Sequence, residues 1–169
     1  MIEILNLHEH KIDFSVFTLI LSEASLRIRR KGLPMWNPEL LTEESLLVLY
    51  RLEDIFILFF DGRPAGAFVL QDSDDDYWGA DSSEHGAMYI HKVAVADGFT
   101  GMNLVDEMVE FAAGLTKKMN KTKLRLDCLE HRVKVRPIYE KNGFVLRDIR
   151  PVHGSAYCLY ERVLLNHQA

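Results

Sequence analysis

The chain has 169 residues, of which 48% are hydrophobic and 27% charged, values typical of a single globular domain with a sizeable core. Its net charge of −5 disfavours non-specific binding to nucleic acid or to an anionic membrane, and favours cationic small molecules. The N-terminal MIEILNLHEH lacks the basic segment and apolar core of a secretory signal. No apolar run reaches the ~18 residues of a membrane span, so we expect a cytoplasmic protein.

The first third of the chain predicts a strand and a helix. Residues 2–7 set single polar residues among apolar ones, as strands do. Asp13 is placed to cap a helix that runs to about residue 31, and Gly32 is its stop signal. The basic last turn of this helix either compensates the helix dipole or brings one arginine to a ligand phosphate. Its residues are Arg27, Arg29, Arg30 and Lys31.

A loop over residues 32–41 contains two prolines and Trp36. Thr42 then caps a second, short helix that runs to about Arg51. Trp36 either belongs to a lid over a pocket or packs against the core, and the sequence leaves both interpretations open.

Residues 54–60 and 64–70 predict two strands joined at Asp61-Gly62, the dipeptide that favours a two-residue hairpin turn. The connection over residues 71–86 is rich in aspartate and also holds Tyr77 and Trp78. It is either a solvated loop or a surface for a cationic amine, which carboxylates and aromatic rings would bind. We expect no metal here, because DSDDD lacks the glycine and distal glutamate of a calcium loop.

A buried strand over residues 88–95 leads through a short turn into a helix over about residues 101–119. The turn contains Asp97, Gly98, Thr100, Gly101 and Asn103. A helix entry leaves backbone N–H groups unpaired and carries the positive end of the helix dipole, so this turn suits a phosphate.

The rest of the chain predicts a strand over residues 122–128, a short helix within residues 132–142 and an antiparallel strand pair over 144–150 and 156–165. Pro137 is comfortable only in the first turn of that helix, and Asn142-Gly143 ends it. Cys128 and Cys158 are too few for a disulfide framework, and we expect buried free thiols. Together the elements predict one α/β (α+β) domain over residues 1–169, with about seven strands and four helices.

Three segments of the chain resemble the GNAT family of acyl-CoA-dependent N-acyltransferases. They are YIHKVAVADGFTGMNLV, KLRLDC and PIYEKNGF, and the last is the most specific. The resemblance implies a central, mostly antiparallel mixed sheet whose fourth and fifth strands splay apart. It also implies acetyl-CoA as cosubstrate, no metal, and direct acetyl transfer to a primary amine of a small molecule or peptide. A homodimer through a sheet edge or the terminal strands is a further expectation.

The resemblance also implies roles for particular residues. The pantetheine arm would pair with the strand around Val93 and Val95, and the Val93 N–H would polarise the thioester carbonyl. Tyr139 would protonate the departing thiolate as a general acid. Arg132, which stands where the family often has asparagine, either reaches a phosphate of CoA or is solvated. The cofactor-binding set is Val93, Ala94, Val95, Thr100, Gly101, Met102, Asn103, Leu104, Val105, Asp106, Arg132 and Tyr139.

The turn departs from the family pattern. Thr100 stands at the usual Arg/Gln position, and Asn103 and Val105 stand at positions usually held by small residues. Asparagine tolerates a positive φ angle, whereas the bulk of Val105 would crowd a pyrophosphate. A non-catalytic module that binds acyl-CoA or another ligand on the same fold is therefore the alternative hypothesis, and an enzyme for a larger acyl-CoA is a third.

His91 is the first candidate for the base that takes the proton of the amine. It alternates with Val93 and Val95, so we expect one shared face, and imidazole suits proton transfer near neutral pH. Tyr89, on the same face, could hold a water molecule. Asp75, Asp76 and His85 are alternative bases, and a structural role for His91 stays open. The predicted acceptor contacts are Trp36, Asp75, Asp76, Tyr77 and Tyr89.

Overall fold

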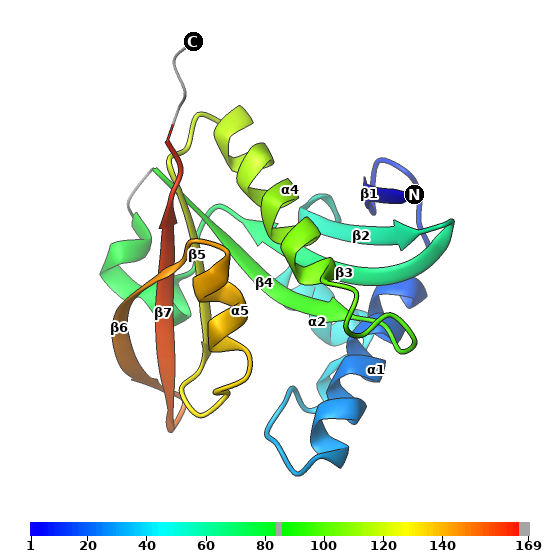
Figure 1. Ribbon diagram of the computed structural model, residues 1–169, viewed down its shortest axis with the longest axis horizontal. Helices are drawn as coiled ribbons and strands as arrows, with labels where there is room; N and C mark the ends of the chain where they lie inside the picture. The colour runs from blue at the N-terminus through cyan, green and yellow to red at the C-terminus, as the bar shows by residue number, and fades with distance from the viewer. Residues whose placement is uncertain (84–85, 166–169) are drawn as a thin grey trace. The chain divides into compact units, whose positions relative to one another are not determined.

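The computed structural model describes residues 1–83 and 86–165, and its strands form one open, seven-stranded sheet in the order β1-β2-β3-β4-β5-β7-β6 (Figure 1). The β1–β2, β2–β3, β5–β7 and β6–β7 pairs are antiparallel, and β4–β5 is parallel. The strands are β1 (Ile2–Asn6), β2 (Ile55–Phe60), β3 (Arg63–Gln71), β4 (Ala87–Val95), β5 (Lys123–Leu129), β6 (Val145–Val152) and β7 (Ser155–Val163). The predicted mixed sheet is confirmed.

Within the described residues, five α-helices accompany the sheet, one more than the sequence predicted. They are α1 (Phe14–Arg30), α2 (Glu43–Leu49), α3 (Asp75–Trp78), α4 (Leu104–Lys118) and α5 (Arg136–Lys141). The additional helix, α3, lies in the acidic connection that the sequence predicted to be a loop. Its N-cap is Asp74, whose side chain accepts from the Tyr77 N–H, and its last residue, Trp78, is buried. No helix in the described residues has the length and apolar character needed to cross a membrane.

The chain divides into two compact units. The first contains Met1–Val69 and Lys92–Met108, and the second contains Leu70–His91 and Val109–Ala169. Strand β4 and helix α4 therefore contribute residues to both. The single domain predicted for residues 1–169 stays a prediction.

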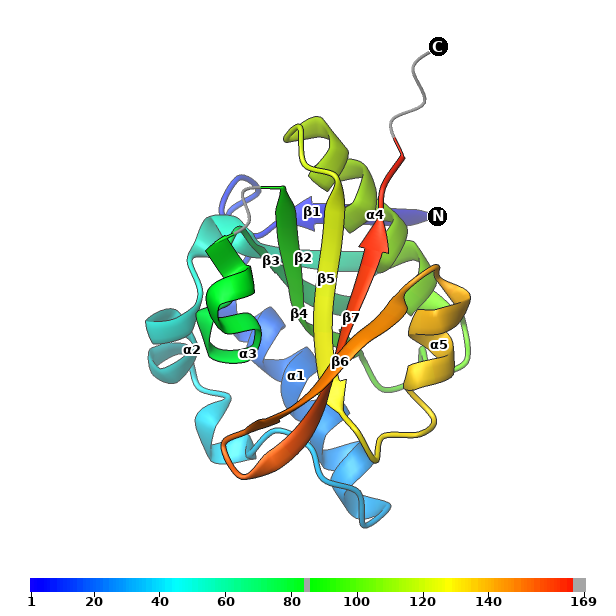
Figure 2. The same cartoon turned by 90° about the vertical axis from the view of Figure 1, so that its left-hand side faces the viewer.

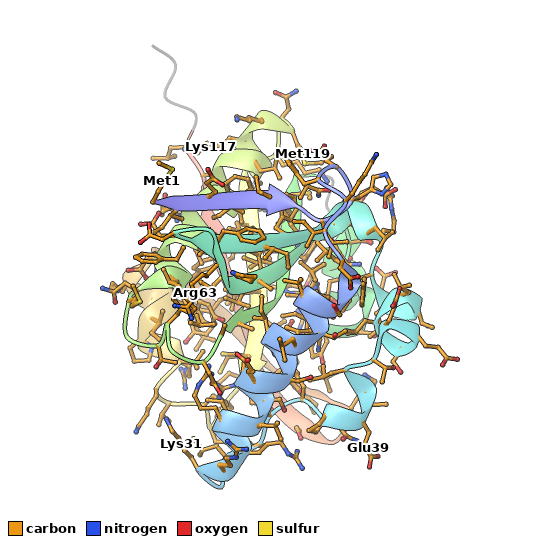
Figure 3. The ribbon with its side chains drawn as sticks, turned by 90° about the vertical axis from the view of Figure 1, so that its right-hand side faces the viewer. Met1, Lys31, Glu39, Arg63, Lys117 and Met119 are labelled. Atoms are coloured by element: carbon orange, nitrogen blue, oxygen red, sulfur yellow. The ribbon has the colours of Figure 1, made fainter. Side chains whose placement is uncertain are left out.

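In the first unit, local signals act as the sequence predicts. Asp13 caps α1 by accepting from the Ser15 N–H at 2.8 Å, and Thr42 caps α2 by accepting from the Ser45 N–H at 3.2 Å. Asp61 and Gly62 have φ angles of 47° and 75°, as a type I′ hairpin turn requires. Helix α1 buries Phe14, Phe17, Leu21 and Ala24. Lys31, labelled in Figure 3, follows its last turn.

In the second unit, two short helices lie on opposite faces of the strands β5, β7 and β6 (Figure 2). Tyr157 of β7 contacts Tyr77 of α3, with ring centroids 4.9 Å apart. Tyr160, three residues further along β7, donates its hydroxyl to Glu140 of α5 at 2.8 Å. Side chains three apart on a strand point to opposite faces, so one face of β7 carries α3 and the other carries α5.

A buried arginine joins the elements of the second unit. Arg125 on β5 donates to Glu161 on β7 and to the Tyr89 hydroxyl on β4, each at 2.9 Å. It also donates to the Asp81 carbonyl at 2.9 Å, and its guanidinium lies 4.4 Å from the Trp78 ring centroid. The side chains of Arg125 and Glu161 are 4% and 5% exposed. A buried ion pair is costly unless its donors are satisfied, and here several are.

We predict that Arg125→Met lowers the free energy of unfolding by about 3 kcal/mol, because the variant removes the buried partner of the Glu161 carboxylate, which then keeps only the half-exposed Arg147 as a counter-ion. Arg162→Met is the matched control. Its partner Glu110 is 60% exposed, so we expect a loss below about 1 kcal/mol. Urea denaturation followed by circular dichroism measures both variants. Equal losses would contradict a special role for the Arg125 pair.

Candidate functional site

The turn between β4 and α4 lies in the first unit and presents an exposed helix entry. Gly98, Gly101 and Asn103 have φ angles of 86°, 81° and 58°, all in the left-handed region. Thr100, Gly101, Met102 and Asn103 are exposed. The Asn103 carbonyl accepts from the Asp106 N–H at 3.1 Å and so starts the helix. Asparagine at Asn103 thus adopts the backbone conformation that glycine would otherwise provide.

Contacts of the buried Phe99 side chain hold the turn in place. Phe99 is buried, contacts the Phe60 ring at 6.1 Å between centroids, and receives the Arg63 guanidinium at 5.0 Å from its own centroid. Val105, the residue whose bulk would crowd a pyrophosphate, is half-buried. An exposed turn held by buried neighbours can bind a ligand without first having to become ordered.

Arg27 contributes the basic end of α1 to this turn. It forms an ion pair with Asp97 and donates to the Val95 carbonyl at 2.8 Å. The Asp97 N–H in turn donates to Glu23 at 2.8 Å. Arg27 therefore ties α1 to the end of β4, and the Val95 carbonyl, a predicted partner of pantetheine, already accepts a hydrogen bond.

The Trp36 loop is attached to α1. The Ser25 hydroxyl donates to the Trp36 carbonyl at 2.5 Å, and the Lys92 ammonium lies 4.8 Å from the Trp36 ring centroid. Trp36 is half-buried. Its ring therefore already has a cation over one face, and its role in acceptor binding stays a prediction.

Lys92 corrects one premise of the sequence analysis. Its φ angle of 52° lies in the left-handed region, inside strand β4. Regular alternation does not continue through such a residue. The prediction that His91, Val93 and Val95 share a face by simple alternation therefore fails at this position.

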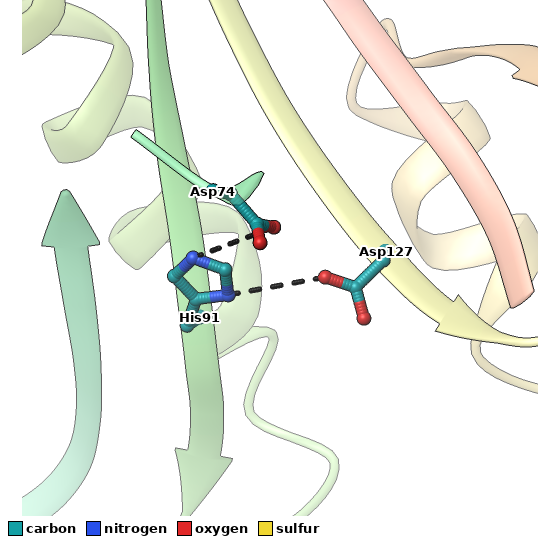
Figure 4. A group of neighbouring side chains, drawn as sticks. All are labelled: Asp74, His91 and Asp127. Carbon is teal, nitrogen blue, oxygen red and sulfur yellow. Dashed lines mark ion pairs between the residues drawn. The ribbon is translucent and has the colours of Figure 1, made fainter. Parts of the chain in front are cut away.

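An imidazole between two carboxylates lies in the second unit (Figure 4). His91 Nε2 is 3.8 Å from Asp74 Oδ2, and His91 Nδ1 is 3.8 Å from Asp127 Oδ1. The side chains of His91 and Asp127 are each 12% exposed and that of Asp74 is 6% exposed. The sequence predicts His91 as the base and neither aspartate as its neighbour. Asp75 and Asp76, the alternative bases, are exposed, and His85 lies outside the described residues.

Asp74 is the most constrained member of this cluster. Its N–H donates to the Ser82 hydroxyl at 2.7 Å, and its Oδ1 accepts from the Tyr77 N–H at 3.3 Å. Its Oδ2 is buried without a hydrogen-bond partner in the described part of the chain. Burial raises the pKa of Asp74 to about 6, and the nearby charges of Asp76 and Asp75 add to the rise, while the Tyr77 hydrogen bond opposes it.

The predicted acceptor contacts Tyr77 and Tyr89 differ in how deeply they are buried. Tyr77 is half-buried beside the cluster, and burial raises its pKa, with further contributions from Asp127 and Tyr157. Tyr89 is fully buried and its hydroxyl accepts from Arg125. The prediction that Tyr89 contacts the acceptor or holds a water molecule for it is therefore wrong, because Trp78 and Arg125 cover its side chain.

Tyr139 lies on α5 and is half-buried, with its ring edge-on to Phe144 at 6.0 Å between centroids. Burial raises the pKa of Tyr139; Cys128 adds to the rise and Arg132 opposes it. The phenol thus stays protonated at neutral pH and can donate a hydrogen bond. The influence of Arg132 means that its charge lies near this phenol.

Cys128 and Cys158 are free thiols, as predicted, and face one another across β5 and β7. Burial raises the pKa of Cys128 to about 12, so it does not form a nucleophilic thiolate at neutral pH. Asp127 and Cys128 are consecutive on β5 and therefore point to opposite faces. The carboxylate cluster and the Tyr139 environment thus approach β5 from its two sides.

An open mixed sheet, a left-handed turn at a helix entry and a tyrosine on a short helix are the features that the resemblance to acyl-CoA-dependent N-acyltransferases predicts. Residues 21–144 match the model of the Acetyltransferase (GNAT) family, and the chain belongs to this family. The predicted family and fold are thus confirmed.

Among its relatives is the uncharacterised N-acetyltransferase YesJ of Bacillus subtilis strain 168. The two are 23% identical over 156 residues, which cover 89% of this chain and 84% of YesJ. A GNAT acetyltransferase of Listeria monocytogenes 4b F2365 has the same fold, with a TM-score of 0.71 and 19% identity over 97% of this chain and 94% of its own. Aminoglycoside acetyltransferase AAC(6')-Ib, solved with coenzyme A and kanamycin, also has this fold, with a TM-score of 0.72. The two sequences are 16% identical, and the match covers 96% of this chain and 95% of AAC(6')-Ib.

We predict that Asp74→Asn stabilises the fold in a pH-dependent way. The folded pKa of about 6 exceeds the ordinary value of 3.8, so above pH 6 the folded state holds a desolvated charge. That difference corresponds to about 3 kcal/mol, which disappears as the pH falls through 6 towards 4. Asparagine keeps the oxygen that caps Tyr77. Urea unfolding at pH 8 and pH 4 should show a gain only at pH 8, and exposed Asp72→Asn should show none. A gain of the same size at both pH values would refute the electrostatic cause.

Proposed function

We propose that this enzyme transfers an acetyl group from acetyl-CoA to a primary amine. The observation that carries the proposal is the turn before α4, where Gly101 and Asn103 take the left-handed conformations that expose a helix entry. Phosphate binding there needs backbone N–H groups and the helix dipole rather than particular side chains. The atypical side chains of the turn are therefore compatible with a pyrophosphate.

The chemistry proceeds by direct attack. The bound ammonium gives one proton to a base, for which His91 is the candidate, and the freed lone pair forms a C–N bond to the thioester carbon. The nitrogen then loses its second proton to solvent as the amide forms. The Val93 N–H stabilises the oxyanion. The C–S bond then breaks, the electron pair leaves on sulfur, and Tyr139 gives the thiolate its proton. Arg132, whose charge lies near the Tyr139 phenol, favours the negative charge that develops on the departing sulfur of CoA.

With this function we propose a single functional domain over residues 1–169. The acceptor is a small-molecule or peptide amine. AAC(6')-Ib, a structural relative that was solved with kanamycin, acts on an aminoglycoside, which fits a small cationic acceptor. Trp36, Asp75, Asp76 and Tyr77 remain proposed acceptor contacts.

Acetyl-CoA binding is tested by thermal and urea unfolding. At about 100 times its dissociation constant, acetyl-CoA should add about 2.7 kcal/mol to the free energy of unfolding. Thr100→Glu should abolish this gain, because it places a negative charge at the exposed helix entry. Gly114→Glu, which adds the same charge at an exposed position of α4 with open space for the side chain, should keep it. No gain for the unmodified protein at millimolar acetyl-CoA would refute the proposed activity.

Tyr139→Phe should lower kcat by about 10²–10⁴-fold while the affinity for acetyl-CoA stays constant, because only the proton donor is removed. Release of free thiol during turnover measures kcat, and the stabilisation described above measures affinity. Tyr50→Phe, at a half-buried tyrosine of the first unit, serves as the control and should leave kcat unchanged. An unchanged kcat in Tyr139→Phe would exclude Tyr139 as the acid.

A further inference from the structure

The cluster of Asp74, His91 and Asp127 brings two carboxylates from two different elements to one imidazole. Asp74 precedes α3, His91 lies on β4 and Asp127 lies on β5. Both nitrogen–oxygen distances are 3.8 Å, which exceeds the 2.7–3.2 Å of an N–H···O hydrogen bond. A small donor placed about 2.8 Å from both atoms of such a pair would bridge them.

Asp74 Oδ2 points into this cluster as an unpartnered acceptor. The side chain is 94% buried, since only 6% of it is exposed, and Oδ2 has no hydrogen-bond partner among the described residues. An unsatisfied buried polar atom costs about 1–3 kcal/mol, more when it is charged. Ser82 and Tyr77 hold the rest of Asp74 in place, so the oxygen cannot easily turn towards solvent. A ligand that donates hydrogen bonds here would remove that cost.

The surroundings select a cationic donor. Two carboxylates favour positive charge, and the pair Tyr77–Tyr157 supplies aromatic rings beside Asp127 and Asp74. A primary ammonium combines a compact charge, three N–H donors and a preference for aromatic faces. His91 supplies a nitrogen that can accept a proton.

A divalent metal ion is the competing occupant of this cluster. His91 offers one nitrogen and each aspartate one oxygen, and these atoms lie within 4.8 Å of one another. The aromatic pair Tyr77–Tyr157 beside the carboxylates favours an organic cation over a metal ion.

We propose that Asp74, His91 and Asp127 form the receptor for one protonated primary amine, in which the carboxylates bind the ammonium and His91 takes its proton. One N–H bond breaks, the proton moves to an imidazole nitrogen, and the amine keeps the electron pair. The use of that pair on a thioester rests on the proposed function, whereas binding does not. The receptor selects alkylammonium ions that have N–H donors and rejects uncharged or quaternary analogues.

The test uses the whole protein without acetyl-CoA and n-butylammonium chloride as the probe, followed by NMR of the histidine side chains and by calorimetry. We expect the His91 signals to shift and saturate. 1-Butanol, which lacks the charge, and butyltrimethylammonium, which lacks N–H donors, should bind at least tenfold more weakly. Asp74→Asn and Asp127→Asn should each weaken n-butylammonium at least tenfold. Asp72→Asn, an exposed neighbour, should stay within twofold.

Several outcomes separate this inference from the proposed function. Amine binding that Asp74→Asn abolishes, in a protein that acetyl-CoA does not stabilise, would support the receptor and refute the transfer. Stabilisation by acetyl-CoA without saturable amine binding, and with an unchanged KM in Asp74→Asn, would overturn the receptor alone. Equal affinity for n-butylammonium and its quaternary analogue would overturn it too. Micromolar binding of Zn²⁺ that is lost in Asp74→Asn would show a metal site instead.

Discussion

The buried guanidinium of Arg125 is the interaction on which the second unit depends. It bonds Glu161 of β7, the Tyr89 hydroxyl of β4 and the carbonyl of Asp81, and it stacks on Trp78 of α3. One fixed, planar group with several donors suits this position better than a lysine ammonium would. Because Trp78 ends α3 and Asp74 caps it, the same contacts decide where the Asp74 carboxylate lies. The stability of the fold and the geometry of the candidate acceptor receptor thus share one residue.

The side chains of strand β5 alternate between two faces, and this alternation separates the candidate base from the candidate acid. Arg125 and Asp127 point to the α3 face, where the imidazole and Asp74 lie, whereas Cys128 points to the α5 face and its thiol influences Tyr139. The group proposed to remove a proton and the group proposed to give one therefore approach the strand from opposite sides. Burial keeps the Tyr139 phenol protonated, and the charge of Asp127 adds to this rise of the Tyr139 pKa from the other face of the strand. The carboxylate that attracts a cation on one face therefore also favours the neutral phenol on the other.

The sequence predicted those parts of the fold that depend on neighbouring residues. The caps Asp13 and Thr42 and the turn Asp61-Gly62 act within three residues of themselves, and all are confirmed. Asp74 was missed because its burial depends on Trp78 and, through it, on Arg125, which is some fifty positions away in the chain. The only nearby sequence feature that pointed to Asp74 was its place as a possible N-cap of a short helix that ends in Tyr77 and Trp78. Tyr89 was wrongly assigned for the same reason, since alternation shows which face a side chain takes but not what covers that face.

The proposed function requires a protein with a net charge of −5 to bind both an anion and a cation, and the turn before α4 is the proposed anion site. A helix entry attracts phosphate through backbone N–H groups and a dipole, which need no basic side chain and survive the replacement of glycine by Asn103. A cationic amine instead needs full negative charges, and the second unit provides them in Asp74 and Asp127. Phosphate binding by backbone N–H groups needs no basic side chains, whereas ammonium binding needs acidic ones. An acidic composition is therefore compatible with both kinds of binding in one chain. The departures of Thr100, Asn103 and Val105 from the family pattern change side chains, while the property that we propose to bind phosphate belongs to the backbone.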